Sequence, residues 1–296
     1  DDLEIMLAAC RRQEDVFGPR AVLDTVLAQR ALARGLVAKC PASLRPRLLS
    51  VYSGLSCAAG LYYLDMDDPE RARRCLSAAR TAAHDARSPA HACYASCEIS
   101  FVAGMSADAS TALDMAAAAG SLAARTDDMS LRALTHQMAA GAFALDGQYA
   151  AFMAASERAQ DALAAGGQVH PESLAYWLGE GELLSQRSAY LLLLDKPEQA
   201  ADAASAALGR LDAGYVSSLA KTSICCGKAQ LRCGRVEEAA QVLGDAARFA
   251  SHSPSVRLTR ELCTARAQMQ QWRSTHPVKM LDEQLAAYGF EVPTSN

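Results

Sequence analysis

Residues 232–240 read Arg232-Cys233-Gly234-Arg235-Val236-Glu237-Glu238-Ala239-Ala240, a turn-like break followed by the start of an Ala-rich helical pattern. The same arrangement recurs along the chain, with one small or apolar anchor residue near the start of each helical pattern. The anchors are Ala72, Ala112, Phe152, Ala200 and Ala239, and they are separated by 40, 40, 48 and 39 residues. A period of about 20–50 residues is typical of stacked helical or strand units that cannot bury their apolar faces alone. The period therefore predicts a stack of helical hairpins.

Turn-forming residues divide the chain into pairs of helical patterns. Residues 1–46 predict an N-terminal helical pair, at 3–17 and 20–39. Residues 47–254 predict five hairpins, which pair 47–65 with 69–86, 90–105 with 109–125, 129–146 with 149–165, 172–194 with 197–211, and 215–233 with 236–250. The break at 166–171 accounts for the one longer interval. Residues 255–296 predict a tail and two capping helices, 255–272 and 277–288, because the last unit of a stack must cover its apolar face.

Composition favours a chain built from helices alone. Hydrophobic residues make up 51% of the 296 residues but aromatic residues only 6%, so small side chains would let helices approach closely. Few stretches alternate apolar and polar residues with the period of two that a strand requires. The net charge of −4 gives no indication of nucleic-acid binding by this segment. Residues 248–279 carry six Lys or Arg against one acidic residue, and this stretch is either a partner surface or a set of solvated helix faces.

The ten cysteines lie mostly among Ala, Leu and Ser in helical patterns, and their spacing shows no disulfide framework. No signal peptide and no apolar run long enough to span a bilayer is visible. We therefore expect a cytoplasmic protein without membrane contact, in which Cys serves as a small buried hydrophobe. The chain begins at Asp1 and enters a helical pattern almost at once, which suggests a segment of a longer protein.

Catalytic and metal-binding motifs are not found. The stretch Gly54-Leu55-Ser56-Cys57-Ala58 lacks the second glycine of a nucleophile elbow and lies in a helical pattern. Cys93 and Cys97 lie four residues apart, near His91, but a structural zinc site usually needs four ligands. We therefore predict a protein that is not an enzyme and carries no cofactor or metal, with these thiols packed in the interior.

The fifth hairpin resembles a tetratricopeptide repeat. Gly227, Gly234, Ala239 and Ala246 take the small positions of that motif and Leu243 takes the larger one. The first hairpin matches through Gly60, Tyr63, Ala72, Leu76 and Ala79, while the other three match loosely. The resemblance implies an all-α, right-handed solenoid. The period near 40 is longer than the usual 34 or so, which fits longer helices.

Four stretches, 60–74, 147–149, 232–240 and 255–281, follow one another in a characteristic order. This order resembles that of the C-terminal tetratricopeptide-like region of actinobacterial helix-turn-helix transcriptional regulators of the XRE type. It implies a region that senses a ligand or a partner, with DNA contacted only through a helix-turn-helix module ahead of this region. Because regulators that read two-fold operators are commonly dimers, it also implies a homodimer.

In repeats of this type the first helix of each pair lines the concave face, which gives a set of candidate groove residues. They are Tyr94, Cys97, Phe101, Leu134, Gln137, Gly141, Glu182, Ser185, Ala189, Lys221, Lys228 and Arg232. Lys221, Lys228 and Arg232 share one helix face, so they would suit a carboxylate-bearing peptide or metabolite, or else form a solvated charged face.

The function expected from these observations is a non-enzymatic ligand- or partner-sensing region that binds a peptide or small molecule in a helical groove. The alternative is a general protein–protein interaction scaffold with no small-molecule ligand.

Overall fold

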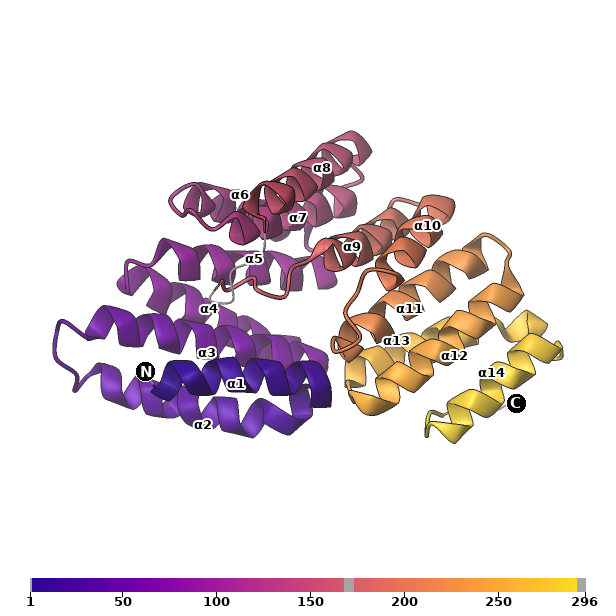
Figure 1. The fold of residues 1–296 in the computed structure, drawn as a ribbon, viewed down its shortest axis with the longest axis horizontal. Helices are drawn as coiled ribbons and strands as arrows, with labels where there is room; N and C mark the ends of the chain where they lie inside the picture. The colour runs from indigo at the N-terminus through magenta and orange to yellow at the C-terminus, as the bar shows by residue number, and fades with distance from the viewer. Residues whose placement is uncertain (1, 168–172, 292–296) are drawn as a thin grey trace. The chain divides into compact units, whose positions relative to one another are not determined.

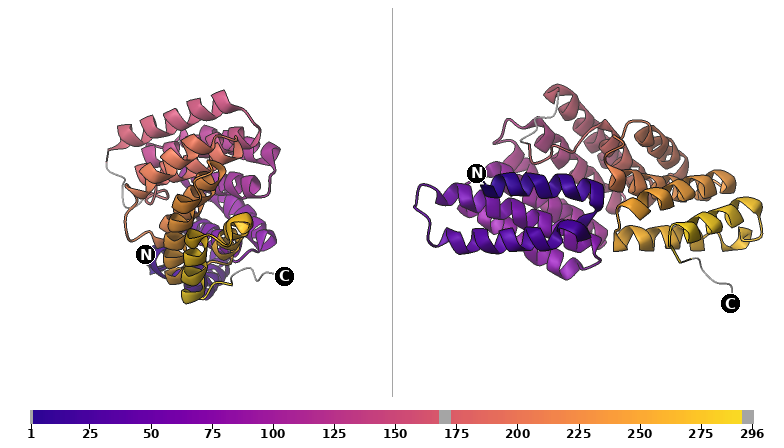
Figure 2. Two further views of the ribbon diagram at one scale, coloured as in Figure 1. Left: turned by 90° about the vertical axis from the view of Figure 1, so that its right-hand side faces the viewer. Right: turned by 60° about the horizontal axis from the view of Figure 1, so that its bottom comes forward.

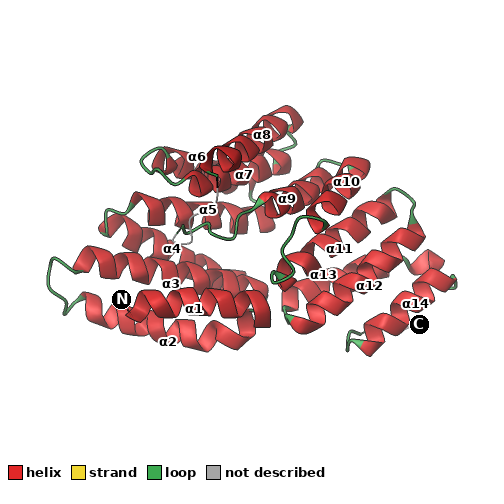
Figure 3. Cartoon of the chain, in the orientation of Figure 1, coloured by secondary structure: helices red, strands yellow, loops and turns green. Residues whose placement is uncertain are grey.

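The computed structural model describes residues 2–167 and 173–291, and within these residues it contains only helices, turns and loops (Figure 3). This confirms the predicted all-α class. The helices are α1 (Asp2–Phe17), α2 (Pro19–Val37), α3 (Arg45–Asp65), α4 (Pro69–Asp85), α5 (Pro89–Met105), α6 (Ala109–Ala123), α7 (Met129–Leu145), α8 (Tyr149–Gly166), α9 (Glu180–Leu193), α10 (Pro197–Leu208), α11 (Val216–Arg232), α12 (Val236–His252), α13 (Val256–Ala267) and α14 (His276–Ala287), with a short 3₁₀ helix at Gln270–Trp272 (Figure 1).

Two helices differ from the expected bounds by more than three residues. The helix predicted from residue 172 begins at Glu180, and part of the break at 166–171 lies outside the described residues. Residues 173–179 form turns instead, since the Ser173 hydroxyl accepts the backbone N–H of Ala175 and donates to Asp128 Oδ2 at 2.7 Å. The first capping helix ends at Ala267 rather than near 272, where the chain tightens into the 3₁₀ turn.

The five hairpins share one turn geometry. In each, three residues join the two helices, and the middle one has a positive φ between 54° and 78°. These left-handed residues are Asp67, Ala107, Gly147, Asp195 and Gly234, and each anchor residue follows five positions later, as the fourth residue of the second helix. All five anchors are buried. The predicted intervals of 40, 40, 48 and 39 residues are therefore confirmed as a repeated local structure.

Capping explains where several of these helices begin. Asp68 accepts the backbone N–H of Arg71 at 2.9 Å, and Asp108 accepts that of Thr111 at 3.0 Å. These side chains satisfy N–H groups that have no partner inside the helix. Pro69 and Pro197 occupy the first helical positions, where a missing N–H costs nothing.

In the first and fifth hairpins the two helices approach each other closely at a glycine. A Cβ atom at Gly60 would lie 2.8 Å from Leu76 Cγ, and one at Gly227 would lie 2.6 Å from Leu243 Cγ. At the equivalent position of the first helix, the five hairpins have Gly, Ser, Ala, Ser and Gly in order. At the equivalent position of the second helix, they have Leu, Ala, Ser, Ala and Leu. Leucine thus occurs only opposite glycine, which keeps the volume at the crossing within narrow limits. The residues, in order, are Gly60, Ser100, Ala140, Ser188 and Gly227, facing Leu76, Ala116, Ser156, Ala204 and Leu243.

The chain divides into two compact units, so that three of the five hairpins lie in the first and two in the second. The first unit holds the residues up to Glu14 together with Arg20–Gly179. In it the first helices α3, α5 and α7 contact one another in order, and α4 and α6 each contact the next first helix. The N-terminal helices α1 and α2 lie side by side (Figure 2), and their residues Leu7, Cys10, Val22 and Val26 share a core with α3.

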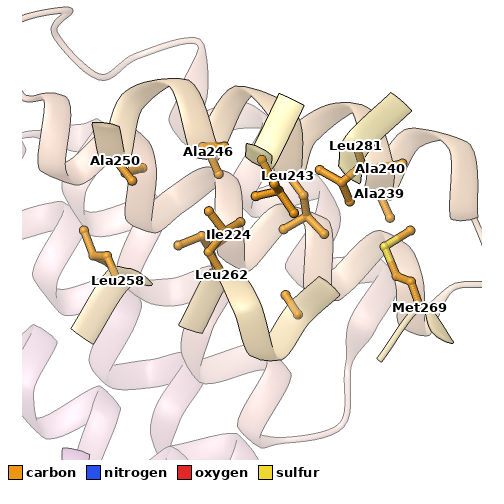
Figure 4. Packing of buried hydrophobic residues seen from close by; sticks show 14 of the residues in the cluster. Ile224, Ala239, Ala240, Leu243, Ala246, Ala250, Leu258, Leu262, Met269 and Leu281 are labelled. Carbon is orange, nitrogen blue, oxygen red and sulfur yellow. The ribbon is translucent and has the colours of Figure 1, made fainter. Parts of the chain in front are cut away.

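The second unit holds Asp15–Pro19 and the residues from Glu180 onward. Helices α9, α11 and α13 contact in order, and α10 packs against α11. The core runs from Ala239, Leu243 and Ala246 of α12 into Leu258 and Leu262 of α13 (Figure 4). Helix α14 adds Val278, Leu281 and Leu285 to the same core. The predicted capping helices therefore do cover the apolar face of the last hairpin.

All ten cysteines lie in the described part of the chain as free thiols, and seven of them are buried, as predicted. No helix in the described ranges is both long and apolar enough to cross a membrane.

Candidate functional site

The candidate groove residues lie on the first helices of the hairpins, α5 and α7 in the first unit and α9 and α11 in the second. Their exposure differs sharply. Six are buried, namely Tyr94, Cys97, Leu134, Gln137, Glu182 and Ser185, while Phe101, Gly141, Lys221 and Lys228 are partly buried and Ala189 and Arg232 are exposed. Half of the predicted lining is therefore inside the helical layer rather than on an open surface.

In the first unit, close packing of α5 on α7 accounts for the burial of Cys97. The Cys97 thiol lies 3.7 Å from the Thr135 hydroxyl, and the Cys93 thiol lies 3.4 Å from the same oxygen. The neighbouring Cys93 thiol is the largest cause that raises the pKa of Cys97, and burial is the second. The Cys97 thiol in turn lowers the pKa of Cys93. These thiols serve as packing groups between two first helices.

Two parts of the chain cover α3 and α5 in this unit. Helix α1 contributes Leu7 and Cys10 to the core that includes Leu55 and Ala58 of α3. Segment 173–179 is tied to the start of α7 by the bond from Ser173 to Asp128, and Tyr176 is near enough to Tyr62 of α3 to affect its pKa. The first helices of this unit are thus partly covered by the chain itself.

A polar cluster lies beneath α1, and the sequence pattern did not reveal it. Arg11 of α1 lies beside Gly54 of α3, where a Cβ atom would stand 3.9 Å from its Nη2. The Arg11 guanidinium carbon lies 5.8 Å from the centre of the Tyr94 ring on α5, within the range of a cation–π interaction. Glu98 lies one turn further along α5, close enough to the Tyr94 hydroxyl for that group to lower its pKa. We call Arg11, Tyr94 and Glu98 the Arg11 cluster.

Burial controls the protonation of this cluster. Desolvation raises the pKa of Glu98 from its ordinary value of 4.5 to about 7, although the hydrogen bond from Tyr94 and the charge of Arg11 both oppose the rise. Desolvation also raises the pKa of Tyr94 well above its usual value. His91, at the start of α5, has its pKa lowered from 6.5 to about 4, mainly by burial and secondarily by Arg11. Near neutral pH, Glu98 is therefore divided between its two protonation states.

In the second unit the candidate residues pair across neighbouring first helices. Lys221 Nζ lies 3.3 Å from Glu182 Oε2, and Ser185 shares a 2.6 Å hydrogen bond with Thr222. Arg232 binds Asp195 at 3.2 Å and donates to the carbonyl of Leu192 at 2.8 Å.

The third basic residue, Lys228, is paired as well. Its Nζ lies 3.3 Å from Glu261 Oε2, and Arg257 reaches the other oxygen of that carboxylate at 3.1 Å. Burial would raise the pKa of Glu261, but Lys228 and Arg257 together hold it below its usual value. The expected basic stripe of Lys221, Lys228 and Arg232 therefore consists of cations that already have carboxylate partners.

Three of the six basic residues of the stretch 248–279, namely Arg248, Arg257 and Arg266, are paired with carboxylates. Arg248 binds Asp245 at 3.2 Å, and Arg266 of α13 binds Asp282 of α14 through two nitrogen–oxygen contacts of 2.5 and 2.7 Å. Arg266 is only 2% exposed, so this pair lies inside the cap. Of the two alternatives for this stretch, a solvated helix face describes Arg248, whose side chain is about half exposed, whereas the buried Arg266 fits neither alternative.

Other features of the described residues give weaker indications of a site. An open depression of about 320 Å³ lies along α4 and α5, lined by Ser77, Arg80, Thr81, His84, Asp85 and Ile99, and it includes none of the candidate groove residues. No group of three or more His, Cys, Asp or Glu side chains within the described ranges is placed to hold a metal ion. The Arg11 cluster is therefore the most distinctive arrangement of chemistry-bearing groups in this set.

Comparison with protein-family models and with curated proteins gives no match to this chain.

Proposed function

We propose that this chain is the non-enzymatic sensing region of a bacterial transcriptional regulator, with tetratricopeptide-like hairpins that form a right-handed solenoid. The observation that carries the proposal is the repeated hairpin itself, with one turn geometry, buried anchors and first helices that contact one another within each unit. Stacks of this kind serve as binding surfaces, because each repeat adds a similar helix face beside the previous one. The sequence resemblance supports a regulator of the XRE type.

In this proposal the first helices bind a peptide or a small molecule, and DNA is contacted only through a separate helix-turn-helix module of the parent protein. The chain's net charge of −4 supports this division, because cationic contacts with phosphates supply much of the affinity of DNA-binding proteins. The proposal also includes a homodimer and a cytoplasmic location. The buried free thiols are consistent with a reducing compartment.

The alternative, a protein–protein scaffold, is favoured by one observation. Six of the candidate groove residues are already buried within the chain, which leaves less room for a small molecule than an open groove would. A protein partner needs a surface rather than a cavity, and the exposed parts of paired first helices supply one.

The test compares the parent protein with this chain alone in a mobility-shift measurement at physiological salt. We expect the parent protein to bind duplex DNA with sequence preference and the isolated chain to show none. Sequence-specific binding by the isolated chain would contradict the proposal. Light scattering on the same samples reports the oligomeric state, and a monomeric parent protein bound to a two-fold operator would contradict the homodimer.

A further inference from the structure

The Arg11 cluster joins a cation to two groups that recognise cations. Tyr94 offers a ring face to the guanidinium, and Glu98, only 6% exposed, offers a carboxylate. An aromatic face beside a carboxylate is well suited to a guanidinium group, which is planar, weakly hydrated and always charged. Both groups belong to α5, which is fixed between α3, α4, α6 and α7. The recognising groups therefore lie on the rigid part of the unit.

The cation, in contrast, comes from a helix with a small buried surface. Of residues 2–14 of α1, only Leu7 and Cys10 are buried, whereas twelve residues of α3 are buried. Ile5 and Met6 are exposed on the outer side of α1. Because stability is unevenly distributed in a fold, an end helix with few buried contacts opens at lower free energy than the core helices do.

The hydrogen-bonding capacity of the Arg11 guanidinium is only partly used. Its Nη2 atom is buried and finds no hydrogen-bond acceptor among the described residues. Arg11 acts on Glu98 through its charge, which lowers the pKa of that carboxyl, as the Tyr94 hydroxyl also does. A guanidinium that reached the carboxylate with two parallel N–H bonds would bind more strongly, since bidentate pairs are the stronger arrangement.

We infer that Tyr94 and Glu98, beside Gly54, form a binding site for an alkylguanidinium group, and that Arg11 of α1 is an internal occupant that an arginine-bearing ligand replaces. This inference rests on the proposed function, since it names a ligand class for the first helices. Gly54 lets α1 lie close to α3: a Cβ atom there would stand 2.7 Å from Leu7 Cδ2 and 3.9 Å from Arg11 Nη2. The ligand's guanidinium would take the place that the Arg11 side chain now fills.

Glu4 and His91 also lie near this site, and they set its electrostatic limits. Glu4 of α1 is paired with Arg47 of α3, so its charge stays with the N-terminal end of the two helices. Burial keeps His91 neutral near pH 7, because its pKa is lowered to about 4. Glu98 is therefore the carboxylate that an incoming guanidinium would meet beside Tyr94.

The experiment removes the Arg11 side chain and then adds ligands that carry a guanidinium group. The full chain carrying Arg11→Ala is melted with millimolar L-arginine amide, with a capped Ala-Arg-Ala peptide, and with L-citrulline amide, a neutral isostere of arginine. We expect both arginine probes to raise Tm by at least about 2 °C once they are well above their Kd, and citrulline amide to leave it unchanged. The two arginine probes distinguish a free metabolite from a peptide source.

The matched control is Arg11→Ala combined with Glu98→Gln, which should remove the response to both arginine probes. An equal response to citrulline amide, or a response that survives Glu98→Gln, would overturn the guanidinium site. A second measurement uses the unaltered chain and does not depend on the folding of the variants. Arginine amide should speed hydrogen exchange of the α1 amides several-fold, and unchanged exchange at saturating probe would overturn the replacement of Arg11. Neither measurement uses DNA, so their failure is distinguishable from failure of the regulator proposal.

Discussion

Gly227 lies directly against Leu243: a Cβ atom added to the glycine would stand 2.6 Å from Cγ and 2.7 Å from Cδ2 of the leucine. Such distances are shorter than carbon atoms tolerate, so the helices α11 and α12 approach each other only because this position has no side chain. The equivalent pair, Gly60 and Leu76, repeats the contact in the first hairpin. The two hairpins that most resemble a tetratricopeptide repeat thus share the same close crossing.

Gly227→Ala should therefore destabilise the chain. The added methyl group must move Leu243 or separate two packed helices, and overpacking of this kind costs roughly 1–3 kcal/mol. Gly104→Ala is the matched control, because Gly104 also lies late in a first helix and a Cβ atom there meets nothing within 4 Å. In an open helical position alanine is favoured over glycine by about 0.5–1 kcal/mol. Chemical denaturation should give shifts of opposite sign, and equal shifts would contradict the crossing.

Volume matching between facing positions leads to a second prediction. Ala239→Phe should cost roughly 1–3 kcal/mol in the fifth hairpin, although phenylalanine stands at the same place, Phe152, in the third. The third hairpin has Ser156 at the position where the fifth has Leu243. Adding Leu243→Ser to Ala239→Phe should therefore cost less than the sum of the two single changes, by roughly 0.5–3 kcal/mol. Strict additivity in a double-mutant cycle would show that these positions do not share volume.

The sequence predicted the hairpins well because each depends on local signals. Pro69, Asp68 and the glycines at the turns determine where helices begin and end within a few residues of themselves. The spacing of the anchors predicts which residues are equivalent from one hairpin to the next. The start of α9 was mispredicted because 173–179 is held by Ser173 and its bond to Asp128, a contact across 45 residues. No local pattern indicates such a bond.

The candidate site was less predictable for the same physical reason. Counting back from each turn finds the first helices but cannot say what covers them. Cys97 is buried by its packing against Thr135, and Arg11 reaches Tyr94 from a helix 83 positions earlier. Gly54 was the one available signal, because a glycine in the middle of a helical pattern often marks a close approach.

Lys228→Glu should destabilise the second unit, which corrects the sequence-based expectation that this side chain faces an open groove. The change removes the partner of Glu261 and places a second carboxylate beside it, and a partly buried charge without a partner is costly. We expect a loss of about 1–3 kcal/mol, larger than for Lys228→Gln, which removes the attraction without adding repulsion. Thermal melts of both variants at low and high salt would check this, and a melt of Lys228→Glu equal to that of the unaltered chain would exclude it.

Glu98→Gln should remove a dependence of stability on pH. The folded state raises the pKa of Glu98 from 4.5 to about 7, so between these values the folded chain holds a proton that the unfolded chain releases. Where the folded state binds more protons, the free energy of unfolding falls as pH rises. This group therefore favours the fold most below about pH 4.5, and its contribution is lost on the way to about pH 7, by on the order of 3 kcal/mol. Glutamine stays neutral throughout and should cancel that slope.

His91 acts in the opposite direction, because its lowered pKa makes stability rise between about 4 and 6.5. Subtracting the denaturation profile of Glu98→Gln from that of the unaltered chain removes the histidine contribution, which the two proteins share. The difference should fall from pH 4.5 to 7 and then remain level. A difference that is flat across this range would show that Glu98 is ionised in the folded state at ordinary pH, paired more closely with Arg11 than the present geometry allows. That outcome would also count against an exchangeable guanidinium at this site, because a tightly paired Arg11 would not give way to a ligand.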